Sequence, residues 1–386
     1  MRTSATVIGD SAARRHPAEG LKRSRPVRRG AGDSLVEKVR FLRQAASHAE
    51  RPRRVRAIET HMSWVFITDK YALKLKKPVR HPFLDFSTIE ARRRNCQAEL
   101  RLNRRLAPGV YLGVIPLVLR ADKRLSLGGA GRVVDWLVQM RRLRKSDTLH
   151  ERIKRHRLRT TDLSSVVASL ARFYRASIPV SIDPASYRRR FESEIRAGRD
   201  ELTRPAWRLP TEVVRDATAA QLDFLRHGRK LLDDRVRERR IVEWHGDLRP
   251  EHIYLGAEPV ITDCLEFDRA LRILDPADEL AYLALECEML GAPDVGRKIF
   301  RIYRRLCDDP LPGQLLHFYM SERACVRARL AIWHLKEPDV RQPQKWRRRA
   351  LRYLSLAAQH AAALGTSMSD KPATPSSALH LLELGQ

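Results

Sequence analysis

Residues 245–252 form an octapeptide rich in ionisable side chains, His-Gly-Asp-Leu-Arg-Pro-Glu-His. It contains a carboxylate at Asp247, a cation two residues later at Arg249 and an imidazole at His252. A second carboxylate, Asp263, follows at the end of a predicted strand. Phosphoryl transfer uses such a set: one carboxylate orients the attacking hydroxyl, a cation offsets charge on the transferred group, and further ligands hold a metal ion on the nucleotide phosphates. The spacing therefore predicts a phosphotransferase site.

The octapeptide resembles the catalytic loop of the protein-kinase-like superfamily, whose pattern is His-Arg-Asp-Leu-Lys-Pro-Glu-Asn. Glycine at the second place is the form found in aminoglycoside phosphotransferases. Further stretches are similar to one bacterial branch of that family, at residues 59–66, 71–78, 83–88 and 263–268. The resemblance implies an α+β, two-lobe fold, with a small β-rich N-lobe and a larger, mostly helical C-lobe. We find no Gly-x-x-x-x-Gly-Lys-Ser/Thr motif, so we expect this chain to lack the P-loop kinase domain to which that branch is sometimes fused.

The resemblance also implies roles for the residues of the octapeptide. Asp247 would be the catalytic base, and His245 would brace the loop. Arg249 would contact the transferred phosphate, where protein kinases have a lysine. Asp263 takes the position of the metal-binding aspartate, and His252 takes that of the second metal ligand.

Nucleotide-binding residues are implied in the N-terminal half. Lys74 is similar to the lysine that grips the α and β phosphates, and Lys76 on the same strand face is its rival. Glu99 is similar to the helix glutamate that pairs with that lysine, with Glu90 as the weaker alternative. The strand that ends around Met140 takes the place of the segment whose backbone holds the adenine.

The sequence departs from the family pattern at His252, where the pattern has asparagine. Asparagine offers magnesium a hard oxygen, whereas imidazole suits zinc, manganese or iron better. Three outcomes stay open: loss of the second metal site, a shift towards manganese, or replacement by a neighbour such as Glu266 or Asp268.

A glycine-rich nucleotide loop is also missing, so residues 61–63 must form that turn. Asp278 resembles the aspartate that braces the catalytic loop from the next helix.

Alternating apolar and polar residues predict the strands that would carry these side chains. Four are expected in the N-terminal half, at 64–67, 71–76, 112–119 and 133–140. Three interrupt a mostly helical C-terminal half, at 241–244, 253–255 and 260–262. Residues 87–106 have a helical pattern, with Ser87 as the expected N-cap and Glu90 three residues later.

Length and composition bound the domain organisation. The chain has 386 residues, 43% of them hydrophobic and 31% charged, which is enough apolar material for a sizeable core. We expect a disordered basic leader over 1–34, the N-lobe over 35–140, the C-lobe over 141–365 and a low-complexity tail over 366–386. We see neither a membrane span of about 18 apolar residues nor an apolar signal segment. Five dispersed cysteines are typical of reduced thiols, so a cytoplasmic protein is expected.

Basic residues outnumber acidic ones by 75 to 46, a net charge of +29. Their clusters are spread along the chain among leucines and acids, which favours solvated helix faces over a nucleic-acid surface. Arg323 and Arg327 lie one helical turn apart and could bind an anionic substrate, although a solvated face or an internal ion pair is the simpler interpretation. Asp275, before Pro276, is interpreted as a helix N-cap.

The leading hypothesis is an ATP- or GTP-dependent phosphotransferase that acts on a hydroxyl of a small molecule, with Mg²⁺ or Mn²⁺ as cofactor. The basic helical half favours a neutral or anionic acceptor over a polycationic drug. A nucleotide-binding pseudokinase is the main alternative, because His252 replaces the expected ligand. A protein kinase would need an Ala-Pro-Glu-like segment, and a nucleic-acid-binding protein would need a clustered basic patch. Neither is evident, and a membrane partner is not expected.

Overall fold

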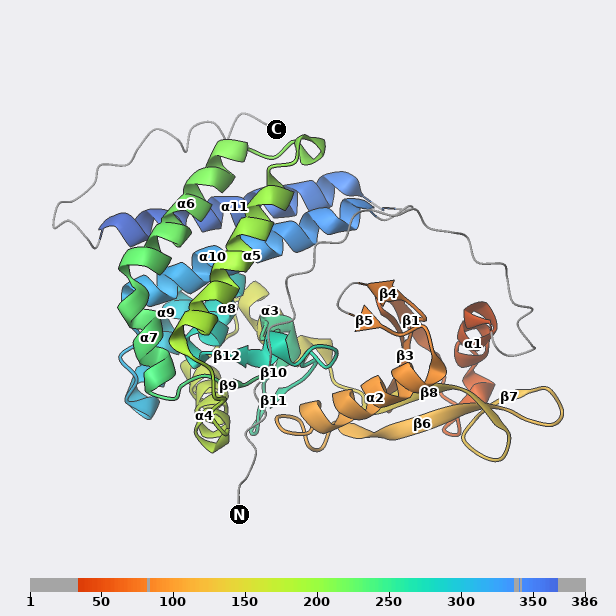
Figure 1. Ribbon diagram of the computed structural model, residues 1–386. Coiled ribbons are helices and arrows are strands. Elements are labelled where there is room, and N and C mark those ends of the chain that lie inside the picture. Colours follow the sequence, from red (N-terminus) through yellow and green to blue (C-terminus); the bar gives the residue numbers. More distant parts are fainter. Residues whose placement is uncertain (1–33, 82–83, 337–339, 341, 367–386) are drawn as a thin grey trace, which may run out of the picture.

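A computed structural model describes residues 34–81, 84–336, 340 and 342–366. Figure 1 shows an antiparallel sheet with its flanking helices on one side and a larger helical lobe on the other. The predicted leader lies outside the described residues apart from Ser34, and the predicted tail lies outside them apart from Thr366.

The N-lobe is built on a six-stranded antiparallel sheet of order β1-β2-β3-β8-β6-β7. Its strands are β1 (Arg56–Glu59), β2 (Ser63–Ile67), β3 (Tyr71–Lys76), β6 (Tyr111–Leu119), β7 (Leu125–Leu127) and β8 (Arg132–Arg141). The predicted hairpin of β2 and β3 is confirmed, and the Thr68 hydroxyl closes its turn by accepting the Tyr71 N–H at 3.0 Å. The sequence pattern missed β1, an edge strand that is half exposed and therefore lacks a clear apolar alternation.

Two helices flank this sheet, α1 (Leu35–Leu42) and α2 (Ile89–Asn103). Helix α2 packs on β8 and β6. Its N-cap is Thr88, whose hydroxyl accepts the Ala91 N–H, so the prediction of Ser87 was wrong. The Ser87 hydroxyl is engaged by Asp85, which leaves the next hydroxyl to cap the helix. The helix also ends earlier than predicted.

A buried carboxylate on β8 fixes both helices to the sheet. Asp135 accepts two hydrogen bonds from Arg92 of α2, at 2.8 and 3.0 Å, and one from Lys38 of α1 at 2.9 Å. All three side chains are at most 5% exposed. Because α2 also carries Glu99, this anchor helps to fix where that side chain lies.

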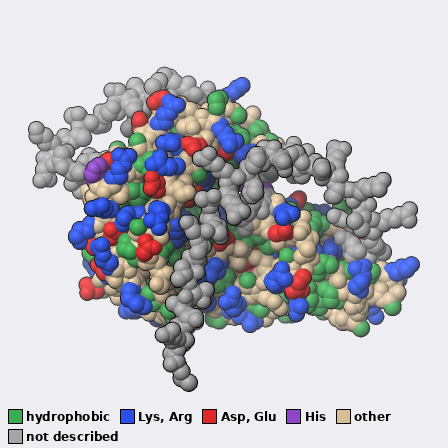
Figure 2. Space-filling view, in the orientation of Figure 1, with side chains coloured by type: hydrophobic (Ala, Val, Ile, Leu, Met, Phe, Trp, Pro, Cys, Tyr) green, Lys and Arg blue, Asp and Glu red, His purple; other side chains and the backbone are tan. Residues whose placement is uncertain are grey.

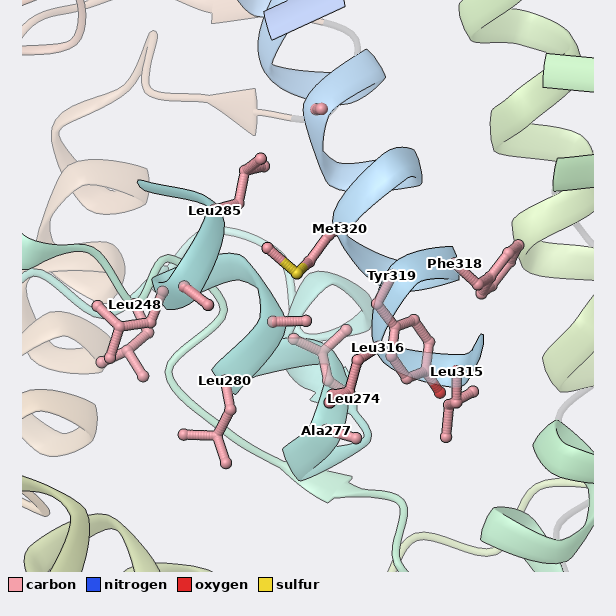
Figure 3. Packing of buried hydrophobic residues seen from close by; sticks show 14 of the residues in the cluster. Leu248, Leu274, Ala277, Leu280, Leu285, Leu315, Leu316, Phe318, Tyr319 and Met320 are labelled. Carbon is pink, nitrogen blue, oxygen red and sulfur yellow. The ribbon is translucent and has the colours of Figure 1, made fainter. Parts of the chain in front are cut away.

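The C-lobe consists mainly of helices around one large apolar core. These are α3 (Leu149–Lys154), α4 (Thr160–Ala176), α5 (Pro184–Leu202), α6 (Thr211–His227), α7 (Arg229–Arg237), α8 (Pro276–Met289), α9 (Pro293–Cys307), α10 (Gly313–Trp333) and α11 (Pro343–Thr366). Helix α8 is buried along nearly its whole length and packs against α9 and α10. Figure 3 shows Leu316 and Met320 of α10 and Leu280 and Leu285 of α8, which belong to this core.

Three short ladders complete the structure, two of them in the C-lobe. They pair β9 (Val242–Glu243) with β12 (Ile273–Leu274), β10 (Ile253–Tyr254) with β11 (Val260–Ile261), and β4 (Arg80–His81) with β5 (Leu84–Asp85). The predicted hairpin of β10 and β11 is confirmed. The strand before the octapeptide pairs instead with β12, just before α8, and this pairing brings the start of α8 to the loop.

Two expectations about the chemistry of the chain can be compared with the structure. All five cysteines are free thiols. None of the described helices is long and apolar enough to cross a membrane.

Candidate active site

A pocket of about 540 Å³ lies between the two lobes. Seven of the eight predicted site residues line it, namely Lys74, Glu99, Met140, Asp247, Arg249, His252 and Asp263. Ala72 of β3 and Met140 of β8, which are partners in the sheet, both contribute to its apolar part. The structure thus brings the implied nucleotide residues of the N-lobe together with the carboxylates of the C-lobe.

The octapeptide follows β9 and turns sharply at Gly246. This residue has φ of 81°, and a Cβ there would lie 3.0 Å from the carbonyl oxygen of Leu271, so glycine is required by both conformation and space. The Gly246 N–H donates to the Glu279 carboxylate at 2.7 Å. Leu248, two residues on, is fully buried and lies among core side chains in Figure 3. The loop is therefore fixed by its backbone and by an apolar anchor.

The carboxylate that braces the loop is Glu279, and the expectation for Asp278 was wrong. Asp278 is turned to α10, where Arg323 holds it with two hydrogen bonds of 2.7 Å. One residue further along α8, Glu279 faces Gly246 and also accepts the hydroxyl of Tyr174 at 3.3 Å. Burial raises the pKa of Glu279 to about 7.

His245 lies behind the pocket and connects the loop to the hairpin before Asp263. Its Nε2 is 2.8 Å from the Thr262 carbonyl oxygen, and the Asp247 N–H donates to its Nδ1 at 3.3 Å. Together these contacts require Nε2 to carry the proton. Burial, with help from His252, lowers the pKa of His245 to about 4, so the ring is neutral at pH 7.

Both oxygens of Asp247 are engaged. The Tyr282 hydroxyl donates to Oδ1 at 2.9 Å, and Arg249 lies 3.0 Å from Oδ2. Burial would raise the pKa of Asp247, but Arg249, His252 and Arg327 outweigh it and lower this pKa to about 2. At neutral pH the group is a fixed carboxylate that can orient a hydroxyl.

Two lysines of β3 share one buried glutamate of α2. Glu99 accepts from Lys74 through Oε1 at 2.9 Å and from Lys76 through Oε2 at 2.6 Å. Each lysine also reaches the C-lobe, Lys74 at Asp263 with 2.9 Å and Lys76 at Glu266 with 2.6 Å. The Lys76 side chain is 1% exposed, whereas the Lys74 side chain is 16% exposed and its partner Asp263 is 49% exposed. Lys74 therefore faces the pocket, and Lys76 is a buried connection between the lobes.

Asp263 occupies a strained and well-defined position. Its φ is 64°, the left-handed region that non-glycine residues rarely adopt. Its N–H donates to the Tyr111 hydroxyl at 3.1 Å, and the next N–H donates to the Asn103 side chain of α2 at 2.9 Å. Lys74, acting against burial, lowers the pKa of Asp263 well below its usual range. The carboxylate is thus charged and aimed between Lys74 and His252.

His252 points its Nε2 at the charged groups of the site. Nδ1 is 2.9 Å from the Asp247 carbonyl oxygen, whereas Nε2 is 2.9 Å from a guanidinium nitrogen of Arg249. Since the carbonyl only accepts and the guanidinium only donates, Nδ1 carries the proton and the lone pair of Nε2 accepts from Arg249. Nε2 is also 3.5 Å from Asp263 Oδ2. Among the described residues no group of three His, Cys, Asp or Glu side chains could hold a metal ion.

Glu266, considered from the sequence as a substitute metal ligand, instead accepts from Lys76. Sequence reasoning missed three residues of the site: Tyr111, Glu279 and Tyr282. The last two lie three residues apart on α8, a spacing that places both on one helix face. The confirmed N-cap at Asp275 could have fixed this helix register, because its carboxylate accepts the Ala277 N–H. No sequence signal assigns the contact of this face with the octapeptide.

Comparisons with known proteins bear on the fold. No family model matches the chain. It is 32% identical over 311 residues to an uncharacterised protein of Mycobacterium tuberculosis, and the match covers 78% of this chain but 59% of that protein. The chain therefore spans less than two thirds of the length of this relative.

Solved structures of similar fold include a choline kinase of Cryptosporidium parvum, with a TM-score of 0.50, 10% identity, and coverage of 86% of this chain and 97% of that one. An aminoglycoside 2'-phosphotransferase in complex with GDP is also similar, with a TM-score of 0.44, 12% identity, and coverage of 81% and 93%. The predicted fold class is confirmed: the chain has a two-lobe, protein-kinase-like fold, with a curled antiparallel sheet in the N-lobe and a helical C-lobe.

Proposed function

We propose that the chain binds a nucleoside triphosphate, ATP or GTP, between its lobes and transfers the γ-phosphate to a hydroxyl of a small molecule. One observation carries the proposal: Lys74, Asp247 and Asp263 line a single pocket. They come from β3, from the octapeptide loop and from the segment just after the β10–β11 hairpin. Choline kinases and aminoglycoside phosphotransferases, whose names state small-molecule acceptors, have similar folds. A cytoplasmic location stays a prediction.

The N-lobe residues would hold the nucleotide. Lys74 would contact its α and β phosphates, and Glu99 would keep Lys74 in place. Lys76 is the weaker candidate, because its ammonium group is enclosed by Glu99 and Glu266 and is 1% exposed. The base would lie in the apolar part of the pocket, beside Met140.

The C-lobe residues would perform the transfer. Asp247 would align the acceptor hydroxyl, with Tyr282 and Arg249 holding its two oxygens in a fixed direction. Arg249 would offset charge on the transferred group. His245, which is neutral and outside the pocket, would act as a positioning residue for the loop. Positioning and electrostatics supply most of the rate in such reactions.

The residues present fit a divalent cation that arrives with the nucleotide. Asp263 is charged, half exposed and binds Lys74 through Oδ1 only, and His252 Nε2, which accepts from Arg249 here, lies 3.5 Å from its Oδ2. Asp263 and His252 would hold the cation, and phosphate oxygens and water would complete its shell. When bound, the cation would neutralise charge on the phosphates. Mg²⁺ and Mn²⁺ are both candidates, because imidazole favours the softer ion.

Thermal denaturation with ATP or GTP, with and without Mg²⁺ or Mn²⁺, tests this proposal. Ligand at ten times its dissociation constant adds about 1.4 kcal/mol to stability, which shifts melting by a few degrees. We expect a metal-dependent shift that Asp263→Ala removes. Glu258→Ala is the matched control, since it removes an exposed carboxylate from the nearby β10–β11 turn. A chain that no nucleotide stabilises would refute the proposal.

A nucleotide-binding pseudokinase is the second candidate, and two observations favour it. His252 replaces the expected asparagine, and its Nε2 already accepts from Arg249 in the neutral tautomer. Lys74 is also paired directly with Asp263. A shift in melting that is unaffected by metal and by Asp263→Ala would favour this candidate over the kinase.

A further inference from the structure

From Asp247, a chain of side-chain contacts leads through Tyr282 to two arginines of α10. The Tyr282 ring, whose hydroxyl contacts Asp247, lies 5.4 Å from Arg323 Cζ and 5.9 Å from Arg327 Cζ, measured to the ring centroid. Both arginines form internal ion pairs, one of the interpretations that the sequence offered, but they use different numbers of guanidinium nitrogens to do so. Arg323 uses Nε and Nη2 on Asp278. Arg327 bonds described residues through Nε alone, so its two terminal amino groups have no such partner.

A further arginine, Arg349 of α11, converges on the same place. Arg327 Nε and Arg349 Nη2 lie 3.2 and 3.3 Å from the phenol oxygen of Tyr353. Tyr353 itself donates to Glu286 at 2.7 Å, and Arg327 pairs with the same carboxylate oxygen at 2.9 Å. Within the described ranges Arg349 has no carboxylate in ion-pair distance. Arg327 is thus paired with Glu286, whereas the charge of Arg349 meets only the Tyr353 phenol among the described residues.

Contacts on either side place this arginine pair, Arg327 and Arg349, at the site. On one side, Arg327 belongs to the charges that hold the pKa of Asp247 low. On the other, His334 follows seven residues later, about 10 Å further along the helix direction. Its ring centroid is 6.0 Å from that of His61, which lines the pocket at the β1–β2 turn. Arg327 therefore lies on the C-lobe side of Asp247, on a helix that ends next to that turn, and Arg349 adjoins Arg327 through Tyr353.

We propose that Arg327 and Arg349 form an anion subsite of the acceptor site. This inference rests on the proposed function and names its substrate class: a hydroxylated small molecule that also carries a phosphate or a carboxylate group. Guanidinium groups present planar, paired donors that match both anions. The acceptor hydroxyl would reach Asp247 while the anion binds the arginine pair. A cationic acceptor would be repelled by the charge of Arg349.

The test uses inorganic phosphate as the probe, with AMP-PNP present at saturation so that the nucleotide phosphate subsite is filled. Calorimetry measures the dissociation constant of phosphate for the wild type, Arg349→Gln and Arg348→Gln. Arg349→Gln is a mild change, since Arg349 is part-exposed and bonds only a phenol. Arg348 is the matched control, an exposed arginine on the same helix. We expect Arg349→Gln to weaken phosphate binding about tenfold or more, and Arg348→Gln to leave it unchanged.

The outcomes separate this inference from the proposed function. Equal phosphate affinity in the wild type and Arg349→Gln, or no phosphate binding at all, overturns the subsite even if AMP-PNP binds. Failure of AMP-PNP to bind, with phosphate binding that still requires Arg349, refutes the nucleotide site and keeps the subsite.

A matched set of probes then identifies the anion. Glycerol, glycerate and glycerol 3-phosphate share a three-carbon hydroxylated frame and differ in charge. Preference for glycerate or for glycerol 3-phosphate distinguishes a carboxylate from a phosphate ligand. Binding of neutral glycerol as tight as that of both anions would overturn the inference.

Discussion

Glu279 should make the stability of the protein depend on pH, and its replacement by glutamine should remove that dependence. The carboxyl group is 1% exposed, and within the part of the chain that the structure describes it bonds the Gly246 N–H and the Tyr174 hydroxyl and forms no ion pair. Burial raises its pKa from the ordinary value of 4.5 to about 7. Glutamine fits the same place, because its oxygen can accept from Gly246 and its amide can donate to Tyr174.

The sign and size of the effect follow from this pKa. Between pH 4.5 and pH 7 the folded protein keeps a proton that the unfolded chain has lost, so stability falls as the pH rises. Below pH 4.5 both states hold the proton and the penalty vanishes. At about 1.4 kcal/mol per pH unit, the full penalty above pH 7 is about 3 kcal/mol. Glu279→Gln cannot ionise and should escape it.

Urea unfolding of both proteins at several values between pH 5 and pH 8 measures this difference. As the pH rises, the free energy of unfolding of the wild type should fall relative to that of Glu279→Gln. Most of the difference of about 3 kcal/mol should appear in this pH range. Glu192→Gln, on the surface of α5, should run parallel to the wild type. If Glu279→Gln also ran parallel, the folded and unfolded states would bind the same number of protons at Glu279 throughout this range, and a pKa raised to about 7 would be refuted.

Three further predictions concern the site itself. Glu99→Gln should lower the free energy of unfolding in urea by about 3–5 kcal/mol, because Lys76 and Lys74 stay buried without their shared carboxylate. Gly246→Ala should lower the melting temperature, since a residue with a Cβ at φ of 81° costs about 1–3 kcal/mol. Asp247→Asn should abolish ADP release in a coupled assay but leave ATP affinity within about twofold, because the residue faces the acceptor rather than the nucleotide.

The parts of the site that are local in sequence were the ones that could be predicted. The octapeptide, its glycine turn and the hairpin before Asp263 depend on residues close together along the chain. Lys74 and Glu99 were identified only through the family resemblance, and the predicted strand and helix carry them. These patterns determine each element well, and the resemblance supplied how the elements meet.

The contacts that were missed depend on how separate elements pack. Asp278 and Glu279 differ by one position on α8, and only the pairing of β9 with β12 decides which of them faces the loop. Lys76 and Glu266 are nearly two hundred residues apart, at a junction between the lobes. A sequence shows that both side chains are charged, but the burial that makes their pairing necessary exists only in the folded structure.

The abundance of arginine carries little functional meaning by itself. Figure 2 shows Lys and Arg spread over the visible face of both lobes rather than gathered in one stripe, which argues against a nucleic-acid surface there. Inside the protein most arginines are matched, as Arg92 is by Asp135 and Arg235 by Asp275. Matched pairs of this kind fix the packing of helices and leave no charge for a ligand. Arg349 differs because it lies next to Arg327 without a carboxylate of its own among the described residues. In so basic a chain, a binding group is recognised by a positive charge that lies near the site and has no carboxylate partner. The number of arginines does not identify it.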